Sequence, residues 1–552
     1  MSVAKFRLIH YAILAIAHMA LTLPNLGSHS LWDMDEGVNA EAAREMIESE
    51  NWITPFYNYE LRTAKPALTY WLIAPSFLCF GVNEFAARLP SAICGLVTIL
   101  LTYELGRRLF SPAAGLISGI SLASCFEFCL ISHAATPDPP LLMFTTLALV
   151  LYWFGSEGDR RWWFVPVGIA TGFGMLTKGP VGLALPGLVI AVHLAWTGRL
   201  RILWDRWLLF GGLAFLLTAV PWYGMVALDS RGQWIKGFFG NENFKRFSEP
   251  AEGHSGWFFY HAALLFVLFA PWSAFLIGTF WNAIRLSRRS IERNDSDELD
   301  KYRFLLSWFF AFLVVFSISA TKLPNYILPL YPALAIMTGR FLERWRIELC
   351  DWRKWYVIVC GAGIVLVGLV TGLGFLLAAG RLPIEVKGLR PMVALGDYAV
   401  IGIVPVITGI LFVWLALRHR RDAAIAACGV GSVTFLGLIA ALPTVAMNEY
   451  KCPQPLVQEA RLYQPTREIR IGSYRWLRHS TVFYARREVR YLSSPSSVSE
   501  FLSLPRPTYL LVPEREWEAL NVELTQPARI LARRYDFLAR CDVLVVANKY
   551  VD

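Results

Sequence analysis

Long apolar stretches separated by short polar segments dominate the pattern of this chain. They recur about thirteen times, and each is about 17 to 25 residues long, which is the length an α-helix needs to cross the hydrocarbon core of a bilayer. This periodicity predicts a polytopic α-helical membrane protein with about thirteen transmembrane helices. The expected spans are 8–26, 87–106, 113–132, 139–155, 162–177, 181–197, 207–227, 257–280, 304–320, 325–342, 355–379, 398–417 and 423–446.

The composition agrees with a membrane protein. Of 552 residues, 55% are hydrophobic and only 17% are charged, a balance that excludes a soluble domain of this size. The first apolar stretch follows Lys5 and Arg7 and has no small-residue cleavage site, so we expect a retained span and not a removed signal peptide. The net charge of +10 does not indicate nucleic-acid binding, because the basic residues lie mainly in short loops and in the C-terminal tail.

The basic loops predict the orientation of the spans. With a cytoplasmic amino terminus, the arginine-rich connections near 107–108, 159–161, 199–206, 285–303, 344–354 and 418–421 all fall inside, as the positive-inside rule requires. The outer loops are then about 27–86, 133–139, 228–257 and 320–326, and an odd number of spans places the tail outside. We therefore expect a multi-pass membrane protein whose functional face is the outer one.

One apolar segment, 66–80, does not fit the count of spans. If it crossed the membrane, every later arginine-rich loop would lie outside. Its length of about 15 residues suits a helix that lies along the outer interface or re-enters the membrane. The sequence therefore predicts a juxtamembrane helix here, with Lys65 at its start.

Two carboxylates stand out in the predicted outer loops. Asp35 precedes 36–48, whose spacing of apolar residues permits an amphipathic helix, and Asp138 is followed by Pro139 and Pro140 at the start of the next span. Helix capping is the simpler explanation for both. A charged carboxylate beside a bilayer is costly, however, and this cost favours a function.

Basic residues also gather on the outer side, against the positive-inside rule. They indicate an anionic ligand, since lysine and arginine neutralise phosphate oxygens. Snorkelling anchors at the membrane surface are the alternative. The residues are Arg62, Lys65, Lys245, Arg246 and Lys322.

The tail, 448–552, differs from the rest in composition and predicts a small α/β domain on the outer side. Strands are expected at 468–473, 481–491, 508–512 and 541–547, and helices at 498–504 and 514–520. Its many arginines could contact anionic lipid headgroups or form an ordinary solvated surface. A disulfide between Cys452 and Cys541 is a hypothesis that an oxidising periplasm would permit.

Several motifs, taken together and in order, resemble the C-type (GT-C) glycosyltransferases, and more narrowly the bacterial 4-amino-4-deoxy-L-arabinose lipid A transferases, relatives of the protein O-mannosyltransferases. The resemblance extends over essentially the whole chain. The motifs are Asp35-Glu36, Thr63-Ala64-Lys65-Pro66-Ala67-Leu68-Thr69-Tyr70-Trp71, Arg88-Leu89-Pro90, Thr136-Pro137-Asp138, Leu176-Thr177-Lys178-Gly179-Pro180, Lys322-Leu323-Pro324-Asn325-Tyr326 and Pro329-Leu330-Tyr331-Pro332.

The resemblance implies an inverting transfer of aminoarabinose from undecaprenyl phosphate to lipid A phosphates, which gives resistance to polymyxin. It places this reaction and the C-terminal domain on the periplasmic face of the bacterial inner membrane. It implies a direct catalytic role for Asp35 and a supporting one for Asp138. The donor phosphate would bind to Lys65, Arg62, Lys245, Arg246, Lys322 and Tyr326, and Glu36, Tyr57 and Tyr59 would belong to a donor or acceptor loop.

Several points stay open at this stage. Asp35 could act as a general base, bind the sugar amine, stabilise the transition state, or hold a divalent metal with Asp138 or Glu84, although no ligand pattern specifies a metal. Protein O-glycosylation from a polyprenyl-phosphate sugar is the nearest alternative function. A lipid transporter is a more distant one, because charges gather at the outer mouth and internal repeats are not evident.

Overall fold

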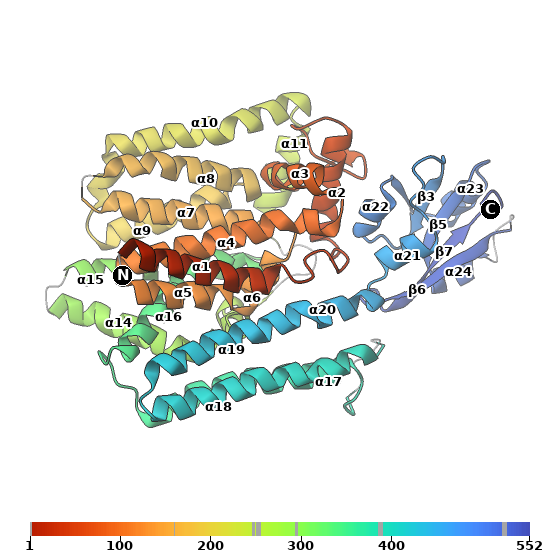
Figure 1. The fold of residues 1–552 in the computed structure, drawn as a ribbon. Coiled ribbons are helices and arrows are strands. Elements are labelled where there is room, and N and C mark those ends of the chain that lie inside the picture. The colour runs from red at the N-terminus through yellow and green to blue at the C-terminus, as the bar shows by residue number, and fades with distance from the viewer. Residues whose placement is uncertain are drawn as a thin grey trace.

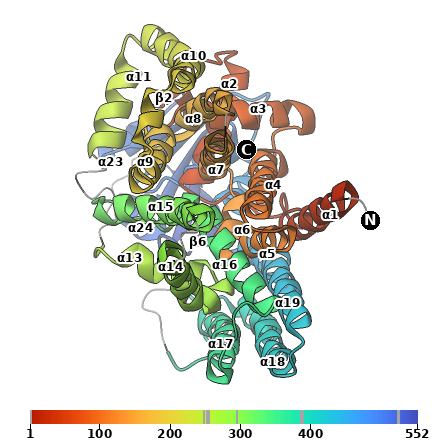
Figure 2. The ribbon, with the colours of Figure 1, turned by 90° about the vertical axis from the view of Figure 1, so that its left-hand side faces the viewer.

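The computed structural model is a long helical bundle with a small α/β domain at one end (Figure 1). It describes residues 3–158, 160–245, 249, 256–292, 296–384, 390–521 and 527–551. Seen along the bundle, α7, α8 and α10 lie on one side and α17, α18 and α19 on the other (Figure 2). The amino terminus lies at the end of the bundle opposite the α/β domain (Figure 1).

The helices of the first half of the chain are α1 Val3–Thr22, α2 Asp35–Glu48, α3 Leu68–Phe80, α4 Glu84–Leu109, α5 Pro112–Ala123, α6 Phe126–Ser132, α7 Asp138–Ser156, η1 Arg161–Trp163, α8 Phe164–Lys178, α9 Val181–Trp196, η2 Leu200–Trp204, α10 Arg206–Asp229, α11 Gln233–Lys236 and the π-helix η3 Gly237–Lys245. Those that follow in the bundle are α13 Tyr260–Leu268, η4 Trp272–Phe275, α14 Leu276–Glu292, α15 Ser296–Ile318, η5 Pro324–Leu330, α16 Tyr331–Arg346, α17 Lys354–Ala378, η6 Val393–Gly402, α18 Ile403–Leu417, α19 Arg421–Ala441, α20 Pro443–Ala446 and η7 Met447–Tyr450.

Each of the thirteen predicted spans contains a helix or a broken pair of helices. Within the described residues, seven helices are long and apolar enough to cross a membrane, and up to nine are if two bent pairs each count as one span. The bends are 66° between α5 and α6 and 116° between α13 and the helix that follows. A membrane-embedded helical fold is confirmed, while the crossing of all thirteen stays a prediction.

Local sequence signals explain where several helices begin and how closely they pack. The side chain of Asn83 accepts a hydrogen bond from the backbone N–H of Ala86 and so caps α4, and Ser111 caps α5 in the same way. Gly168 of α8 packs against Gly211 of α10, where an added Cβ would lie 1.8 Å from a carbonyl oxygen. Only glycine permits this approach of the two helices.

The C-terminal domain contains a five-stranded sheet in the order β4-β3-β5-β7-β6. Strands β4, β3 and β5 are parallel, and β7 runs antiparallel to β5 and β6. The elements are α21 Pro453–Glu459, β3 Arg470–Tyr474, α22 Ser480–Ala485, β4 Val489–Leu492, α23 Pro495–Leu502, β5 Thr508–Pro513, α24 Glu514–Asn521, β6 Arg529–Asp536 and β7 Cys541–Ala547. The single strand predicted at 481–491 is wrong, because its first half is helix α22.

The long loop after α1 brings this domain into contact with the bundle. This loop contains α2, a two-stranded hairpin of β1 Phe56–Tyr57 and β2 Glu60–Leu61, and the helix α3. The helices predicted at 36–48 and 66–80 are confirmed as α2 and α3. Figure 1 shows α2 and α3 at the end of the bundle that faces α22. The outer loops and the α/β domain therefore form one continuous region.

Candidate active site

Asp138, the first residue of α7, is held by two side chains that are distant in sequence. Its Oδ1 accepts a 2.6 Å hydrogen bond from Nζ of Lys178, at the end of α8, and its Oδ2 accepts a 2.9 Å bond from Nδ2 of Asn325 in η5. Asp138 is buried and makes no side-chain cap bond to its own helix. The capping alternative therefore does not describe it, and its charge is used to hold a lysine.

Lys65 lies on the same small cavity as this ion pair. The cavity has a volume of about 100 Å³ and is also lined by Asp138, Lys178 and Tyr326. Nζ of Lys178 lies 5.1 Å from the centre of the Tyr326 ring, a cation–π geometry. Two lysines, one from the segment before α3 and one from the end of α8, thus lie beside one carboxylate, an arrangement suited to a phosphate group.

Asp35 begins α2 and contributes to the same electrostatic environment. It makes no cap bond to its helix, is solvent-exposed, and lines an adjacent apolar cavity of about 470 Å³. Although its side chain reaches solvent, the protein atoms around Asp35 displace part of its hydration, and this desolvation raises its pKa. The charge of Asp138 raises the pKa further, while Lys65, Lys178 and Arg62 act in the opposite direction. The structure therefore brings the two predicted carboxylates into one charged region.

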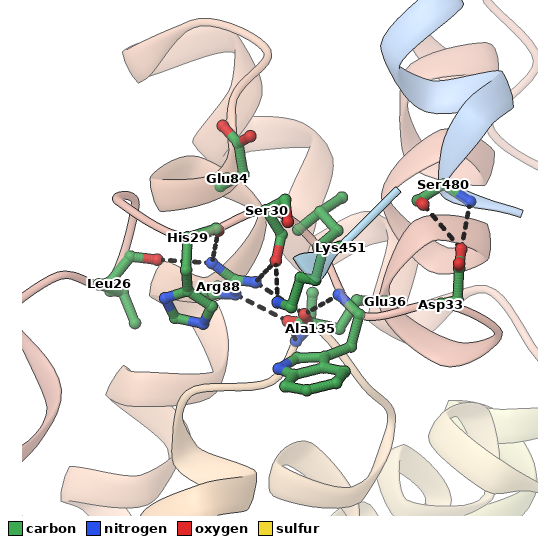
Figure 3. Close-up of polar contacts among 12 residues, drawn as sticks. Leu26, His29, Ser30, Asp33, Glu36, Glu84, Arg88, Ala135, Lys451 and Ser480 are labelled. Carbon is green, nitrogen blue, oxygen red and sulfur yellow. Dashed lines mark hydrogen bonds and ion pairs between the residues drawn. The ribbon is translucent and has the colours of Figure 1, made fainter. Parts of the chain in front are cut away.

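Glu36 is the centre of a buried network that fixes the Asp35 loop (Figure 3). Its carboxylate forms a two-pronged ion pair with Arg88 of α4, with both N···O distances 2.8 Å, and also accepts from the backbone N–H groups of Trp32 and Ala135. Both charged side chains are almost completely buried. Arg88 donates in addition to the backbone carbonyls of Leu26, His29 and Ser30.

That Glu36 belongs to a donor or acceptor loop stays a prediction, and this network shows which protein groups its side chain holds. All its acceptor capacity is directed to protein groups, so Glu36 is a positioning residue. One end of the network precedes Asp35 by three residues, at Trp32, and the other precedes Asp138 by three, at Ala135. The Glu36–Arg88 pair therefore sets the position of one acidic loop relative to the other.

The predicted loop residues Tyr57 and Tyr59 also have structural contacts. The hydroxyl of Tyr57 donates to the carbonyl of His479 in the C-terminal domain, and that of Tyr59 contacts Glu48 of α2. Neither tyrosine lines the cavities that contain Asp35 or Asp138. The structure does not bring them to the site.

The remaining predicted cations differ in their placement. Nε of Arg62 donates to the Tyr70 hydroxyl at 2.7 Å, and its charge acts on Asp35. Nζ of Lys322 donates to the backbone carbonyls of Ser317 and Ser319, so this buried lysine satisfies the end of α15 and is not directed to the cavity.

Two further predicted cations come from the third outer loop. Lys245 ends the π-helix η3, but its side chain lies outside the described part of the chain, as does all of Arg246. Their assignment to the donor phosphate stays a prediction.

A metal site and a disulfide were open hypotheses. Within the described residues, no group of three or more histidine, cysteine, aspartate or glutamate side chains could hold a metal ion. Glu84 accepts hydrogen bonds from Gln454 and Tyr484 instead. Cys452 and Cys541 are both free thiols in this structure, which does not support the hypothesis of a disulfide between them.

Lys178 and Asn325 are the site residues that sequence reasoning did not assign. Both lie in motifs that carry the family resemblance, yet neither was given a role. Lys178 ends a predicted span, where a lysine is ordinarily a snorkelling anchor, and its partner is 40 positions away. The signal that could have found it is a lysine at the predicted outer end of a span, against the positive-inside rule.

Comparisons with known proteins agree with this architecture. Residues 64–224 match the family described as dolichyl-phosphate-mannose-protein mannosyltransferase. The undecaprenyl phosphate-alpha-4-amino-4-deoxy-L-arabinose arabinosyl transferase 2 of Pseudomonas fluorescens is 30% identical over 443 residues, which cover 78% of this chain and 75% of that protein. The corresponding transferase of Edwardsiella ictaluri is 30% identical over 81% of this chain and 79% of its own length.

The whole fold has a solved counterpart. The crystal structure of ArnT from Cupriavidus metallidurans bound to undecaprenyl phosphate is 24% identical, with a TM-score of 0.80, and the match covers 99% of this chain and 98% of that one. The fold, together with the curated relatives, thus defines a membrane-embedded glycosyltransferase of the C type. The identity over most of two curated relatives then shows the family: the chain belongs to the undecaprenyl phosphate-alpha-4-amino-4-deoxy-L-arabinose arabinosyl transferases.

Proposed function

We propose that this enzyme transfers 4-amino-4-deoxy-L-arabinose from undecaprenyl phosphate to phosphate groups of lipid A, on the periplasmic face of the bacterial inner membrane. The observation that carries the proposal is the convergence of Lys65 and Lys178 on Asp138, in a region that also contains Asp35. Adding sugar amines to lipid A phosphates lowers the negative charge of the membrane surface, which gives resistance to polymyxin and other cationic peptides.

In the proposed reaction, an oxygen of the lipid A phosphate attacks the anomeric carbon from the face opposite the donor phosphate. The new carbon–oxygen bond forms as the bond to the donor oxygen breaks, and the electron pair leaves on undecaprenyl phosphate. Lys65 and Lys178 neutralise the charge that develops there. Nζ of Lys178 has three donors, and Asp138 occupies one of them, so the others can bind phosphate oxygens.

The carboxylates have different proposed roles. A phosphate acceptor is already ionised, so Asp35 need not remove a proton from it, and the proposed task of Asp35 is to bind the sugar amine and stabilise positive charge at the reacting carbon. Asp138 acts through Lys178 and is a positioning residue. Arg62 and Tyr326 complete the group proposed around the donor phosphate.

Lipid A mass spectrometry tests this function. Cells that lack their own transferase but make the donor would carry this chain, its Asp35→Asn variant, or an empty vector. We expect the mass gain of aminoarabinose with the unaltered chain and its loss with Asp35→Asn at equal membrane levels. The matched control is Asp297→Asn, an exposed carboxylate paired with Lys301, which should keep full transfer.

The same cells distinguish lipid A from a protein acceptor. The match of residues 64–224 to protein mannosyltransferases makes protein glycosylation the second candidate. Unmodified lipid A from a well-expressed unaltered chain, together with sugar on serine or threonine residues of periplasmic proteins, would replace the proposed acceptor.

A further inference from the structure

A large polar cavity that is separate from the site above lies between the C-terminal domain and the outer end of α4. Its volume is about 990 Å³. Glu84, the first residue of α4, lines it together with Val82 and Asn83, and α4 is among the helices apolar enough to cross a membrane. The cavity therefore lies where a membrane helix ends, at the depth of lipid headgroups.

The opposite wall comes from the C-terminal domain. It is formed by α21, by the segment after it and by α22, which Figure 1 shows at the end of the bundle near α2 and α3. Beside this region, Phe80 at the end of α3 is 55% exposed and its ring packs on that of Phe85. A lipid could thus place its headgroup in the cavity and keep its acyl chains along an apolar surface.

Three arginines line the cavity and give it an excess of positive charge. Arg486 donates to the carbonyl of Val82 at 2.9 Å and lies over the Tyr463 ring, and Arg467 is half-buried nearby. Arg461 is exposed, and among the described residues no side-chain partner is found for it. An arginine that points into a cavity without a partner is suited to a phosphate.

The remaining lining matches a saccharide. Carboxylates face the arginines at Glu84 and Glu459, but Glu459 is already paired with Arg534 at 2.9 Å. Amide side chains accept from and donate to sugar hydroxyls, and the ring of Tyr463, 48% exposed, offers a flat surface. The lining amides are Gln454, Gln458 and Gln464. Nε2 of Gln454 already donates to Glu84 and Nε2 of Gln464 to the Tyr509 hydroxyl, so these two offer their amide oxygens to a sugar. Asn83, also in the lining, caps α4.

From this lining we propose that the cavity binds the phosphorylated saccharide headgroup of a membrane lipid, and, resting on the function proposed above, that this lipid is the acceptor. Hydrogen bonds connect the cavity to the reaction site. Glu84 accepts from the Tyr484 hydroxyl at 3.1 Å, and that hydroxyl accepts from the N–H of Leu31 at 2.7 Å, four residues before Asp35. The cavity would hold one end of the acceptor while another part of it reaches Asp35.

Binding to the purified full chain in detergent tests the ligand class. Calorimetric titrations would use three probes: the phosphorylated disaccharide freed of acyl chains, the same disaccharide without phosphate, and inorganic phosphate. We expect the first to bind best. Arg461→Gln should weaken it about tenfold by removing a charge-assisted contact, and Tyr463→Ala should weaken both disaccharides. The matched control is Arg515→Gln, whose side chain is 76% exposed on α24 and lies outside the cavity.

Steady-state transfer gives a second readout. Arg461→Gln should raise KM for the acceptor and leave kcat and KM for the donor unchanged. Equal headgroup binding by Arg461→Gln and the unaltered chain, or inorganic phosphate bound as well as the headgroup, would overturn the inference. If instead the headgroup binds through Arg461 but the unaltered chain transfers no sugar to lipid A, the cavity stands as a headgroup site and the proposed reaction fails.

Discussion

Some neighbours of Asp35 disfavour the ionised form of its carboxylate, and others favour it. Partial desolvation by the surrounding protein and the neighbouring charge of Asp138 raise its pKa above the ordinary value of 3.8, against the effect of Lys65, Lys178 and Arg62. The proposed role needs the ionised form, because only a carboxylate binds an amine and stabilises positive charge. Activity should therefore be lost as pH falls through this raised pKa, and be full well above it.

Replacing Asp138 tests this electrostatic coupling. Asp138→Asn removes a negative neighbour of Asp35 and leaves the charge of Lys178 unneutralised, and both changes lower the pKa of Asp35. In a pH profile of kcat/KM for transfer, the acid limb should therefore move to lower pH. The maximal rate should also fall, because Lys178 loses the partner that positions it.

The exposed pair of Asp297 and Lys301 again supplies the control, since Asp297→Asn should leave the profile unchanged. An acid limb that stays in place in Asp138→Asn would mean that Asp138 does not act on Asp35. A limb that moves to higher pH would contradict the assignment of Asp35 as the titrating group.

At the scale of elements, a single ion pair joins the loop before α2, the start of α4 and the loop before α7. Removing one member of a buried ion pair leaves an unpaired buried charge, at a cost of about 3–5 kcal/mol. Arg88→Met should therefore lower the melting temperature of the purified chain strongly. It should also lower kcat at temperatures where the variant is still folded, because the two acidic loops lose their fixed spacing.

Arg381→Met is the comparison, because Arg381 pairs with Asp397 on the surface, where both side chains are largely exposed. That change should leave both quantities close to those of the unaltered chain. An Arg88→Met variant with unchanged melting temperature and kcat would show that the Glu36–Arg88 pair does not hold the loops.

The sequence predicted the elements of the bundle better than those of the C-terminal sheet. A membrane span has a simple sequence signal, a long run of apolar residues, and every predicted span contains a helix. Strand β6 was missed because Arg529–Asp536 is largely polar: it pairs only with β7 at the edge of the sheet. The range 481–491 looked like a strand because of its β-branched and aromatic residues, but tertiary contacts of α22 with α2 override that propensity.

The acidic residues of the site could be predicted from the sequence, but their partners could not. Asp35 and Asp138 stand out because charges beside a bilayer are rare. Lys178 and Asn325 join Asp138 over 40 and 187 positions, a pairing that no local pattern contains. In the same way, the role of Glu36 follows from its pairing with Arg88, 52 positions away.

At the scale of the whole molecule, the C-terminal domain and the linker before it hold the outer loops. Asp33 accepts hydrogen bonds from the backbone N–H and the hydroxyl of Ser480, and Asn58 bonds to the backbone of Val489. The loop that contains Asp35 is thus held from α4 on one side and from the α/β domain on the other. The position of Asp35 depends on both.

Lys451 lies at the junction of the helical bundle and the C-terminal domain. Its titration allows the contact between the two to be measured. Lys451 is 5% exposed, its Nζ donates to the carbonyl of Ser30 at 2.8 Å, and it lies 3.9 Å from the centre of the Trp32 ring. Burial lowers its pKa from 10.5 to about 7, although Glu36 acts in the opposite direction. Between these two values the unfolded chain binds more protons than the folded chain. Lys451 therefore makes the free energy of unfolding rise with pH across this window, by at most about 1.4 kcal/mol per pH unit.

Lys451→Met removes that contribution. We subtract the melting temperature of the unaltered chain from that of the variant at each pH. This difference should be largest in favour of the variant at pH 6 to 7 and should fall steadily toward pH 9.5. Tryptophan fluorescence of the full chain in detergent would follow unfolding at each pH, with Lys549→Met, an exposed lysine near the carboxyl terminus, as the control. A constant difference between Lys451→Met and the unaltered chain would mean that Lys451 keeps its charge in the folded protein up to high pH. Its ammonium group would then have to be stabilised by Glu36 and the Trp32 ring strongly enough to offset burial.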